Sequence, residues 1–206
     1  MHESSPSSLF DNPDLAAEEL AAHLLVTPTA LDSLTLRAAT KVVTYMHPRV
    51  IPSGTVFIRE GEAQNTGEMM LVLEGDITIE NDMSGPDQRM VVNVVGPGNI
   101  IGEMGLLDGE PRSATCTAVT PVVVAVLTRA ALIRLMRDDS TVAVQLLLAL
   151  STRMSQRLRE TSRKLRTFSQ MNKAMQEEMQ VVMSSRVGLH QQKKPSSEGI
   201  SIEENK

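Results

Sequence analysis

Six short segments between residues 55 and 127 constrain the fold of this chain more than any other feature. Each is rich in β-branched residues or alternates apolar with polar positions, and each is ended by Gly, Pro, Asn or Asp. Short strands separated by such turn residues are typical of an all-β sandwich or barrel. The six segments are Thr55–Arg59, Glu68–Leu73, Asp76–Glu80, Met90–Val95, Ala114–Val119 and Val122–Leu127.

Helical spacing on both sides of these strands predicts an α+β domain. Asn-Pro and Thr-Pro pairs, suited to the cap and first turn of a helix, open the first two helical segments. The expected helices are Asp14–Val26, Pro28–Tyr45, Arg129–Arg137 and a long helix from about Thr141 to about Ser184, with a single helical turn at Met104–Leu107. The expected division is a disordered N-terminus at 1–12, N-terminal helices at 13–47, strands at 48–128, C-terminal helices at 129–184 and a disordered tail at 185–206.

The long C-terminal helix predicts a coiled coil. Its seam positions alternate spacings of four and three residues, and eight of the eleven are apolar. Asn172 occupies an a position, which favours a parallel dimer in one register. The alternative is an amphipathic helix packed on its own domain, but about 44 residues at 1.5 Å each would reach roughly 65 Å, beyond one small β domain. The seam consists of Leu147, Ser151, Met154, Leu158, Thr161, Leu165, Phe168, Asn172, Met175, Met179 and Val182.

Composition excludes several classes of protein. Cys116 is the only cysteine, which excludes a disulfide framework and a cysteine-based zinc site, and the four histidines show no metal-ligand spacing. Aromatic residues make up 2%, too few for a platform that stacks single-stranded nucleic acid. No apolar run reaches about 18 residues, and the N-terminus lacks the features of a signal peptide. We therefore expect a cytoplasmic protein with no membrane segment and no bound metal.

Charge is distributed unevenly along the chain. Residues 1–150 contain nine basic and nineteen acidic residues, whereas residues 151–167 contain six basic residues and one acidic residue. An acidic body argues against broad contact with a nucleic-acid backbone. The basic segment is either a solvated helix face or the cover of an acidic pocket with an anionic ligand.

The segment Gly96–Ala118 contains the residue types that bind a phosphate joined to a sugar. Gly102 would allow the backbone to approach a ligand closely, and a helical turn after it would direct free N–H groups at an anion. Arg112 offers a bidentate cation, Ser113 a hydroxyl donor, and Glu103 an acceptor for a sugar hydroxyl. Taken singly, the glycine could be a turn residue, and Glu103 and Arg112 an ion pair. The combination favours a nucleotide site.

Four segments resemble the cyclic nucleotide-binding domain family, and more closely its bacterial catabolite activator protein branch: PSGTVFIREGE (52–62), MMLVLEGDITI (69–79), GPGNIIGEMGLL (96–107) and EPRSAT (110–115). The resemblance implies a jelly-roll-like β-roll with flanking helices. It implies that Glu103 binds the ribose 2′-hydroxyl, that Arg112 and Ser113 hold the cyclic phosphate, and that the backbone near Gly102 and Met104 assists. Because phosphate and Glu103 are then the only expected partners of Arg112, Arg112→Leu should abolish ligand binding without unfolding the roll.

A second resemblance lies on the long helix, where LSTRMSQRLRETSRK (150–164) is similar to the dimerisation helix of the same branch. It implies that Thr161 contacts the adenine bound in its own subunit, that Ser162 reaches the ligand of the partner, and that Arg157 pairs with Glu103. The DNA-binding winged helix of that branch would follow this helix. Here the coiled-coil pattern continues after Arg166 and only 40 residues remain, so we expect no DNA-binding domain.

Together these features predict a stand-alone cAMP sensor, with cGMP as the second candidate ligand. It would form a parallel homodimer and signal to an unidentified protein effector through its C-terminal helices. Ser113 and the Thr161-Ser162 pair favour cAMP. The alternatives with the same fold are a scaffold or adaptor that binds no ligand, or one that binds a cyclic dinucleotide. No nucleophile–base pair is visible, so we expect neither enzymatic activity nor a cofactor.

The Asn172→Leu variant tests the coiled coil. Leucine at an a position should tighten helix association, and loss of the buried polar pair should loosen the register. Sedimentation analysis should show a dimer for both forms, with the variant dissociating at lower concentration. Monomers for both forms would contradict the coiled-coil prediction.

Overall fold

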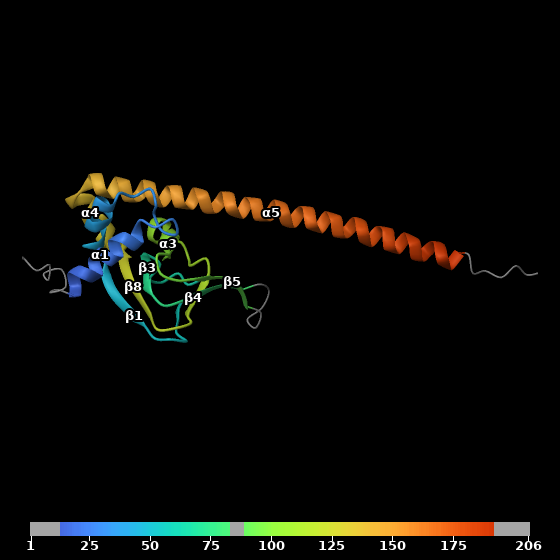
Figure 1. The fold of residues 1–206 in the computed structure, drawn as a ribbon, viewed down its shortest axis with the longest axis horizontal. Coiled ribbons are helices and arrows are strands. Elements are labelled where there is room, and N and C mark those ends of the chain that lie inside the picture. The colour runs from blue at the N-terminus through green and yellow to red at the C-terminus, as the bar shows by residue number, and fades with distance from the viewer. Residues whose placement is uncertain (1–12, 83–88, 192–206) are drawn as a thin grey trace, which may run out of the picture. The chain divides into compact units, whose positions relative to one another are not determined.

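The computed structural model describes residues 13–82 and 89–191, which are drawn in colour in Figure 1. The chain divides into two units, one up to Ser155 and one from Gln156 onward. In the first unit, the described strands form two four-stranded antiparallel sheets, in the orders β1-β8-β3-β6 and β2-β7-β4-β5. This arrangement is the expected β-roll. The strands are β1 (His47–Ile51), β2 (Val56–Ile58), β3 (Glu68–Glu74), β4 (Ile77–Asp82), β5 (Arg89–Val95), β6 (Ile100–Ile101), β7 (Thr115–Ala118) and β8 (Val122–Thr128).

Two of these strands, β1 and β6, were not among the six expected segments. Strand β1 has the sequence HPRVI, which contains a proline and does not alternate, and β6 is only two residues long. Both are defined by their partners, because β1 pairs with β8 and β6 pairs with β3. Their pairing therefore depends on tertiary contacts.

The described helices are α1 (Pro13–Leu25), α2 (Leu36–Val43), α3 (Glu103–Asp108), α4 (Arg129–Asp138) and α5 (Ser140–Gln191). Four of them agree closely with the expected segments, although α5 continues to Gln191 instead of ending near Ser184. Residues 185–191 of the expected disordered tail (185–206) continue α5 instead. The rest of that tail, residues 192–206, and the expected disordered N-terminus at 1–12 lie outside the described residues.

The expected helix Pro28–Tyr45 is shorter in the structure, where residues 28–35 form turns and α2 begins at Leu36. Tertiary contacts explain the difference. The hydroxyls of Thr27 and Thr29 both donate to the carbonyl oxygen of Gly98, at 3.0 and 2.7 Å. These contacts fix the segment against the β5–β6 turn, and Thr35 then caps α2 by accepting from the backbone N–H of Ala38.

The central strand β3 is covered on both faces. Met69 and Leu71 belong to the core beneath the helices, whereas Met70 and Val72 belong to the core between the two sheets. Successive residues of a strand point to opposite faces, so a strand enclosed on both sides has a continuous apolar sequence. The run MMLVL in β3 is such a continuous apolar sequence.

The second unit contains the end of α5, and its apolar residues are exposed in the single chain. Leu158, Leu165 and Phe168 each keep more than 60% of their surface exposed, and Met175 and Met179 more than 55%. All five occupy the expected seam, so the helix presents an apolar face that this chain alone does not cover. Among the described residues, no helix combines the length and hydrophobicity needed to cross a membrane.

The Gly75→Ala variant tests the β3–β4 turn. Gly75 has φ of +84°, and a Cβ there would overlap the carbonyl oxygen of Pro121 and lie 2.8 Å from the hydroxyl of Thr120. Gly54→Ala is the matched control, because its φ is +77° but no atom lies within 4 Å of the added Cβ. Urea unfolding should show a loss of about 1–2 kcal/mol for the control from the positive φ alone, and a clearly larger loss for Gly75→Ala. Equal losses would contradict the steric argument.

Candidate ligand-binding site

The short helix α3 begins at a glycine that no other residue can replace without strain. Gly102 has φ of +75°. A Cβ there would lie 2.5 Å from the carbonyl oxygen of Glu68 and 2.7 Å from the Nη1 atom of Arg112. The backbone at Gly102 is therefore in close contact with both β3 and Arg112. Glu103, the next residue, is 4% exposed.

Arg112 is buried and holds three segments of backbone together. Its Nη1 atom donates to the carbonyl oxygens of Glu68 at 3.0 Å and Gly102 at 3.3 Å, and its Nη2 atom donates to that of Asn65 at 2.7 Å. Burial lowers the pKa of Arg112, and the nearby carboxylates of Glu68 and Glu62 oppose this shift.

These contacts correct the expectation that phosphate and Glu103 would be the only partners of Arg112. Three backbone carbonyls accept from its guanidinium in the structure. Replacing Arg112 by leucine would remove this donor from all three carbonyls, of which that of Gly102 keeps a further donor, the backbone N–H of Leu106 at 3.2 Å. The other two carbonyls lose their bond to the guanidinium, so the variant should lose stability as well as ligand binding.

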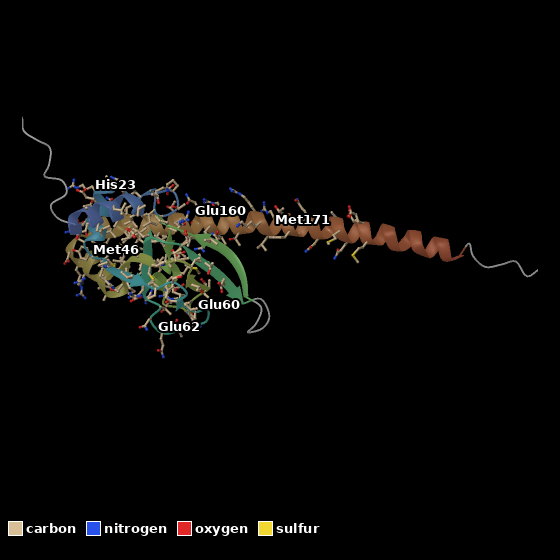
Figure 2. The ribbon with its side chains drawn as sticks, turned by 60° about the horizontal axis from the view of Figure 1, so that its bottom comes forward. His23, Met46, Glu60, Glu62, Glu160 and Met171 are labelled. Carbon is tan, nitrogen blue, oxygen red and sulfur yellow. The ribbon has the colours of Figure 1, made fainter. Side chains whose placement is uncertain are left out.

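A polar pocket of about 310 Å³ opens beside Arg112. Within it, the Nη1 and Nη2 atoms of Arg49 each donate to the carboxylate of Glu68 at 2.9 Å, and this bonding raises the pKa of Arg49. The pocket is lined by Arg49, Phe57, Ile58, Glu62, Gln64, Asn65, Glu68, Met70 and Arg112. Figure 2 shows Glu60 and Glu62 in the loop that follows β2. The pocket thus joins the buried Arg112 to solvent through acidic and amide side chains.

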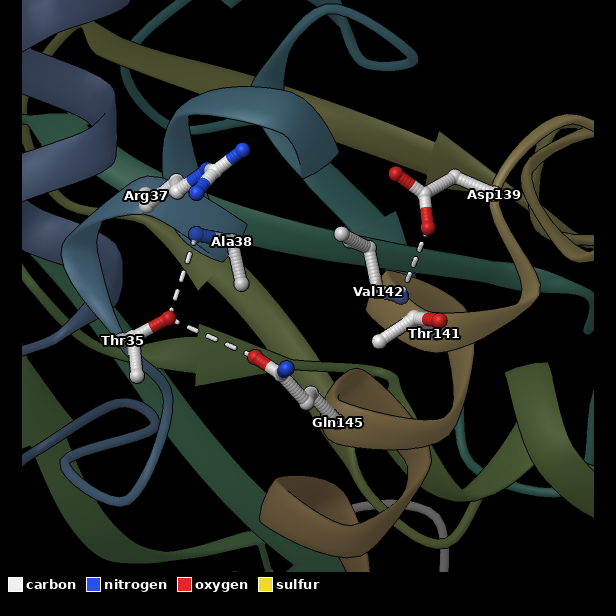
Figure 3. Close-up of a pocket in the computed structure, with 7 residues that line it drawn as sticks. All are labelled: Thr35, Arg37, Ala38, Asp139, Thr141, Val142 and Gln145. Carbon is white, nitrogen blue, oxygen red and sulfur yellow. Dashed lines mark hydrogen bonds between the residues drawn. The ribbon is translucent and has the colours of Figure 1, made fainter.

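A second pocket, of about 290 Å³, lies between α2 and the start of α5 (Figure 3). Its polar groups are largely engaged in local bonds, since Thr35 donates to Gln145 at 3.3 Å and Asp139 accepts from the backbone N–H of Val142 at 3.0 Å. None of the expected site residues lines this pocket. Of the expected site residues, Arg112 alone lines the first pocket, which is therefore the better candidate of these two.

The expected site residues of the roll come together in the structure. Gly102 and Glu103 lie at the start of α3, where the carbonyl of Gly102 contacts Arg112. Ser113 is exposed, and its hydroxyl lies 3.8 Å from the sulfur of Met104, which is 40% exposed. The hydroxyl of Ser113 is thus accessible beside the buried guanidinium.

Three expected site residues lie on α5 in the second unit. Thr161, Ser162 and Arg157 are exposed, and the hydroxyl of Thr161 donates to the carbonyl of Arg157 at 2.9 Å within the helix. Their contacts with a ligand stay a prediction. In the described part of the chain, no group of three His, Cys, Asp or Glu residues is arranged to hold a metal ion.

Sequence reasoning missed the residues of the 62–68 loop and Arg49. Their role depends on backbone carbonyls and on an ion pair between different strands, and neither has a sequence pattern. Asn65 is the residue of this loop whose type could have drawn attention to it. Its φ is +53°, and asparagine is among the few residues that tolerate this conformation.

The chain also matches known proteins in this region. Residues 48–139 match the family model described as the cyclic nucleotide-binding domain. The match begins in β1 and ends at the junction of α4 and α5, so it covers the roll and the site described above. This part of the chain belongs to the cyclic nucleotide-binding domain family, as its sequence segments predicted.

Two curated relatives share this region. A cyclic nucleotide-gated potassium channel of Rhizobium etli is 38% identical over 85 residues, which are 41% of this chain and 21% of the channel. The CRP-like protein Clp of Xanthomonas campestris pv. campestris is 30% identical over 142 residues, which are 66% of this chain and 59% of that protein. The chain therefore spans a minor part of the first relative and a little over half of the second.

Three solved structures have the same fold. A cyclic nucleotide-binding domain from Methylobacillus flagellatus has a TM-score of 0.59 at 28% identity, covering 71% of this chain and 80% of the other. The regulatory domain of Toxoplasma gondii PKA, solved with cAMP, has a TM-score of 0.53 at 28% identity, covering 63% and 48%. The c-di-GMP responsive global regulator CLP of Xanthomonas campestris has a TM-score of 0.54 at 26% identity, covering 63% and 62%.

The Arg112→Leu variant tests the structural part of the site. An unsatisfied buried carbonyl costs about 1–3 kcal/mol. Because Asn65 is exposed and Gly102 keeps the N–H of Leu106, urea unfolding should show a loss of at least about 1 kcal/mol. Arg59→Leu is the matched control, because Arg59 is an exposed arginine just after β2 and should leave stability nearly unchanged. Equal stability of Arg112→Leu and the parent protein would contradict the role of the three carbonyl contacts.

Proposed function

We propose that this chain is a regulatory, non-enzymatic sensor of a cyclic nucleotide, with cAMP as the preferred ligand. The observation that carries the proposal is the buried guanidinium of Arg112 beside Gly102 and Ser113. The three carbonyls that accept from it are neutral, so these bonds leave its positive charge available to an anion. A cyclic phosphate carries one negative charge and matches the fork of a guanidinium.

The neighbouring residues supply the other groups that such a ligand requires. The exposed hydroxyl of Ser113 donates to a second phosphate oxygen, and the carboxylate of Glu103 accepts from a ribose hydroxyl. Thr161 and Ser162 contact the adenine in this proposal, which follows the resemblance of the α5 segment. The regulatory domain of Toxoplasma gondii PKA, which shares this fold and was solved with cAMP, supports this class of ligand.

The proposal includes a parallel homodimer through α5. Leu158, Leu165, Phe168, Met175 and Met179 lie on one seam with 3- and 4-residue spacing and are all more than half exposed. A second copy of the helix would remove this apolar surface from water. Figure 2 shows side chains along this part of α5, with Met171 labelled beside the seam.

The output is a change in the paired helices that a protein effector recognises. A ligand that contacts both the roll and α5 has different affinities for two helix arrangements, and can therefore shift the equilibrium between them. Met171, which is 62% exposed and lies outside the seam, belongs to an adaptable surface for such an effector.

After the cyclic mononucleotides cAMP and cGMP, the second candidate class of ligand is a cyclic dinucleotide. The observation that favours it is the structural similarity to the Xanthomonas campestris regulator that is described as c-di-GMP responsive. A scaffold that binds no ligand is the remaining alternative, and the presence of Arg112, Ser113 and Glu103 argues against it.

Calorimetric titration of the purified, nucleotide-stripped chain tests the proposal. We expect one cAMP to bind per chain, more tightly than cGMP and cyclic di-GMP. Glu103→Gln should weaken cAMP binding by about tenfold or more, because it removes a charge-assisted hydrogen bond. Glu110→Gln is the matched control, an exposed acid on the same connection that should bind as the parent does. Binding of cyclic di-GMP alone would favour the second candidate, and no heat from any of the three would overturn the proposal.

A further inference from the structure

Arg49 lines the pocket beside Arg112, yet neither the sequence predictions nor the proposed ligand contacts give it a role. It lies in β1, and its ion-pair partner Glu68 begins β3; both strands are neighbours of β8 in one sheet. Ile51 and Met70, each two positions further along the same strands, belong to the core between the two sheets. Because alternate residues of a strand share a face, Arg49 and Glu68 also point into the space between the sheets.

Glu68 binds both arginines, and it binds each of them with a different group. Its carboxylate accepts from Nη1 and Nη2 of Arg49 at 2.9 Å, whereas its backbone carbonyl accepts from Nη1 of Arg112 at 3.0 Å. The side chains of Arg49 and Glu68 are 39% and 23% exposed, and the two parallel bonds between them fix the orientation of the carboxylate. The backbone of Glu68 therefore holds Arg112 while its negative charge is paired with Arg49.

The guanidinium of Arg112 keeps N–H groups for a further acceptor. Nη1 bonds to two backbone carbonyls, and Nη2 bonds to one although it carries two hydrogens. In the part of the chain that the structure describes, the Nε–H of Arg112 has no acceptor. These unused donors suit a phosphate oxygen, and they suit a carboxylate oxygen equally well.

The charges around this pocket are balanced while Arg49 is present. The charged residues that line it are Arg49 and Arg112, with Glu62 and Glu68 as the opposing acids. Burial lowers the pKa of Arg112, and among the carboxylates that oppose this shift Glu68 has the largest effect. Without Arg49, the acid that acts most strongly on Arg112 would lose its partner, and the lining of the pocket would carry a net negative charge. An anion that enters would then be repelled.

We propose that Arg49 is a positioning residue of the ligand site. By binding the carboxylate of Glu68, it keeps this carboxylate away from Arg112 and leaves the unused N–H groups of Arg112 to the phosphate of the ligand. This inference rests on the proposed function, since it requires an anion at Arg112. It concerns the affinity for that anion and requires no movement of the roll.

Calorimetric titration of the full chain with cAMP, arranged as a double-mutant cycle, tests the inference. Arg49→Gln should weaken cAMP binding by about tenfold or more, because the unpaired carboxylate of Glu68 competes with the phosphate for Arg112 and repels it. The double variant Arg49→Gln with Glu68→Gln should bind cAMP within about threefold of the parent, since the competing charge is then absent. Recovery of affinity on removal of a second charged group is the expected signature.

The Glu68→Gln single variant separates this role from a purely structural one. It breaks the same ion pair but leaves no competing carboxylate, so it should bind cAMP at least as tightly as the parent does. An ion pair that served the fold alone would give similar losses of affinity in Glu68→Gln and Arg49→Gln. Arg49→Met keeps the length of the side chain without its charge, and it carries the same prediction if Arg49→Gln fails to fold.

Arg137→Gln is the control for the general loss of one positive charge. Arg137 is an exposed arginine in the last turn of α4 and does not line the pocket, so this variant should bind cAMP as the parent does.

The outcomes separate this inference from the function on which it rests. Equal binding by Arg49→Gln and the parent, or a loss that the added Glu68→Gln does not restore, would overturn the role of Arg49 and leave the proposed function standing. Absence of cAMP binding by the parent protein would overturn the proposed function, and this inference with it.

Discussion

The three hydrogen bonds from the guanidinium of Arg112 to backbone carbonyls are the contact on which the candidate site depends. They join the loop before β3, the start of α3 and the approach to β7 around one buried charge. Desolvation of a cation is unfavourable unless donors find acceptors, and here neutral carbonyls fill that role. The same side chain can therefore stabilise the fold and remain attractive to an anion. In the proposed function, the ligand affinity would be a net quantity, because a phosphate would compete with contacts that already exist.

The fold was largely predictable where local patterns and the final packing agree. The alternating segments bounded by glycine became strands, and the helical turn expected at Met104–Leu107 is the short helix α3. Strand β6 could not be predicted, because two residues become a strand only through pairing with β3. The helix predicted from Pro28 begins only at Leu36. The capping signal in the sequence is local, whereas hydrogen bonds from Thr27 and Thr29 to the distant Gly98 hold this segment in turns.

The chemistry of the site was predictable to the level of residue types, and its contacts were not. A motif identified Glu103, Arg112 and Ser113, because phosphate recognition requires particular side chains at particular spacings. The carbonyls that hold Arg112 belong to Asn65, Glu68 and Gly102, and any residue offers a carbonyl. Sequence therefore points to candidate side chains for a ligand more readily than to the backbone groups that position them.

The exposed seam of α5 has a consequence for how such a protein would respond in a cell. Pairing of two chains is a second-order process, so the fraction of paired helices rises with the total amount of the protein. A sensor that needs a paired helix for its output would then report the product of two variables, ligand level and its own abundance. Expression of the gene would itself set the sensitivity of the response, and a cell could silence the signal by dilution without changing the ligand.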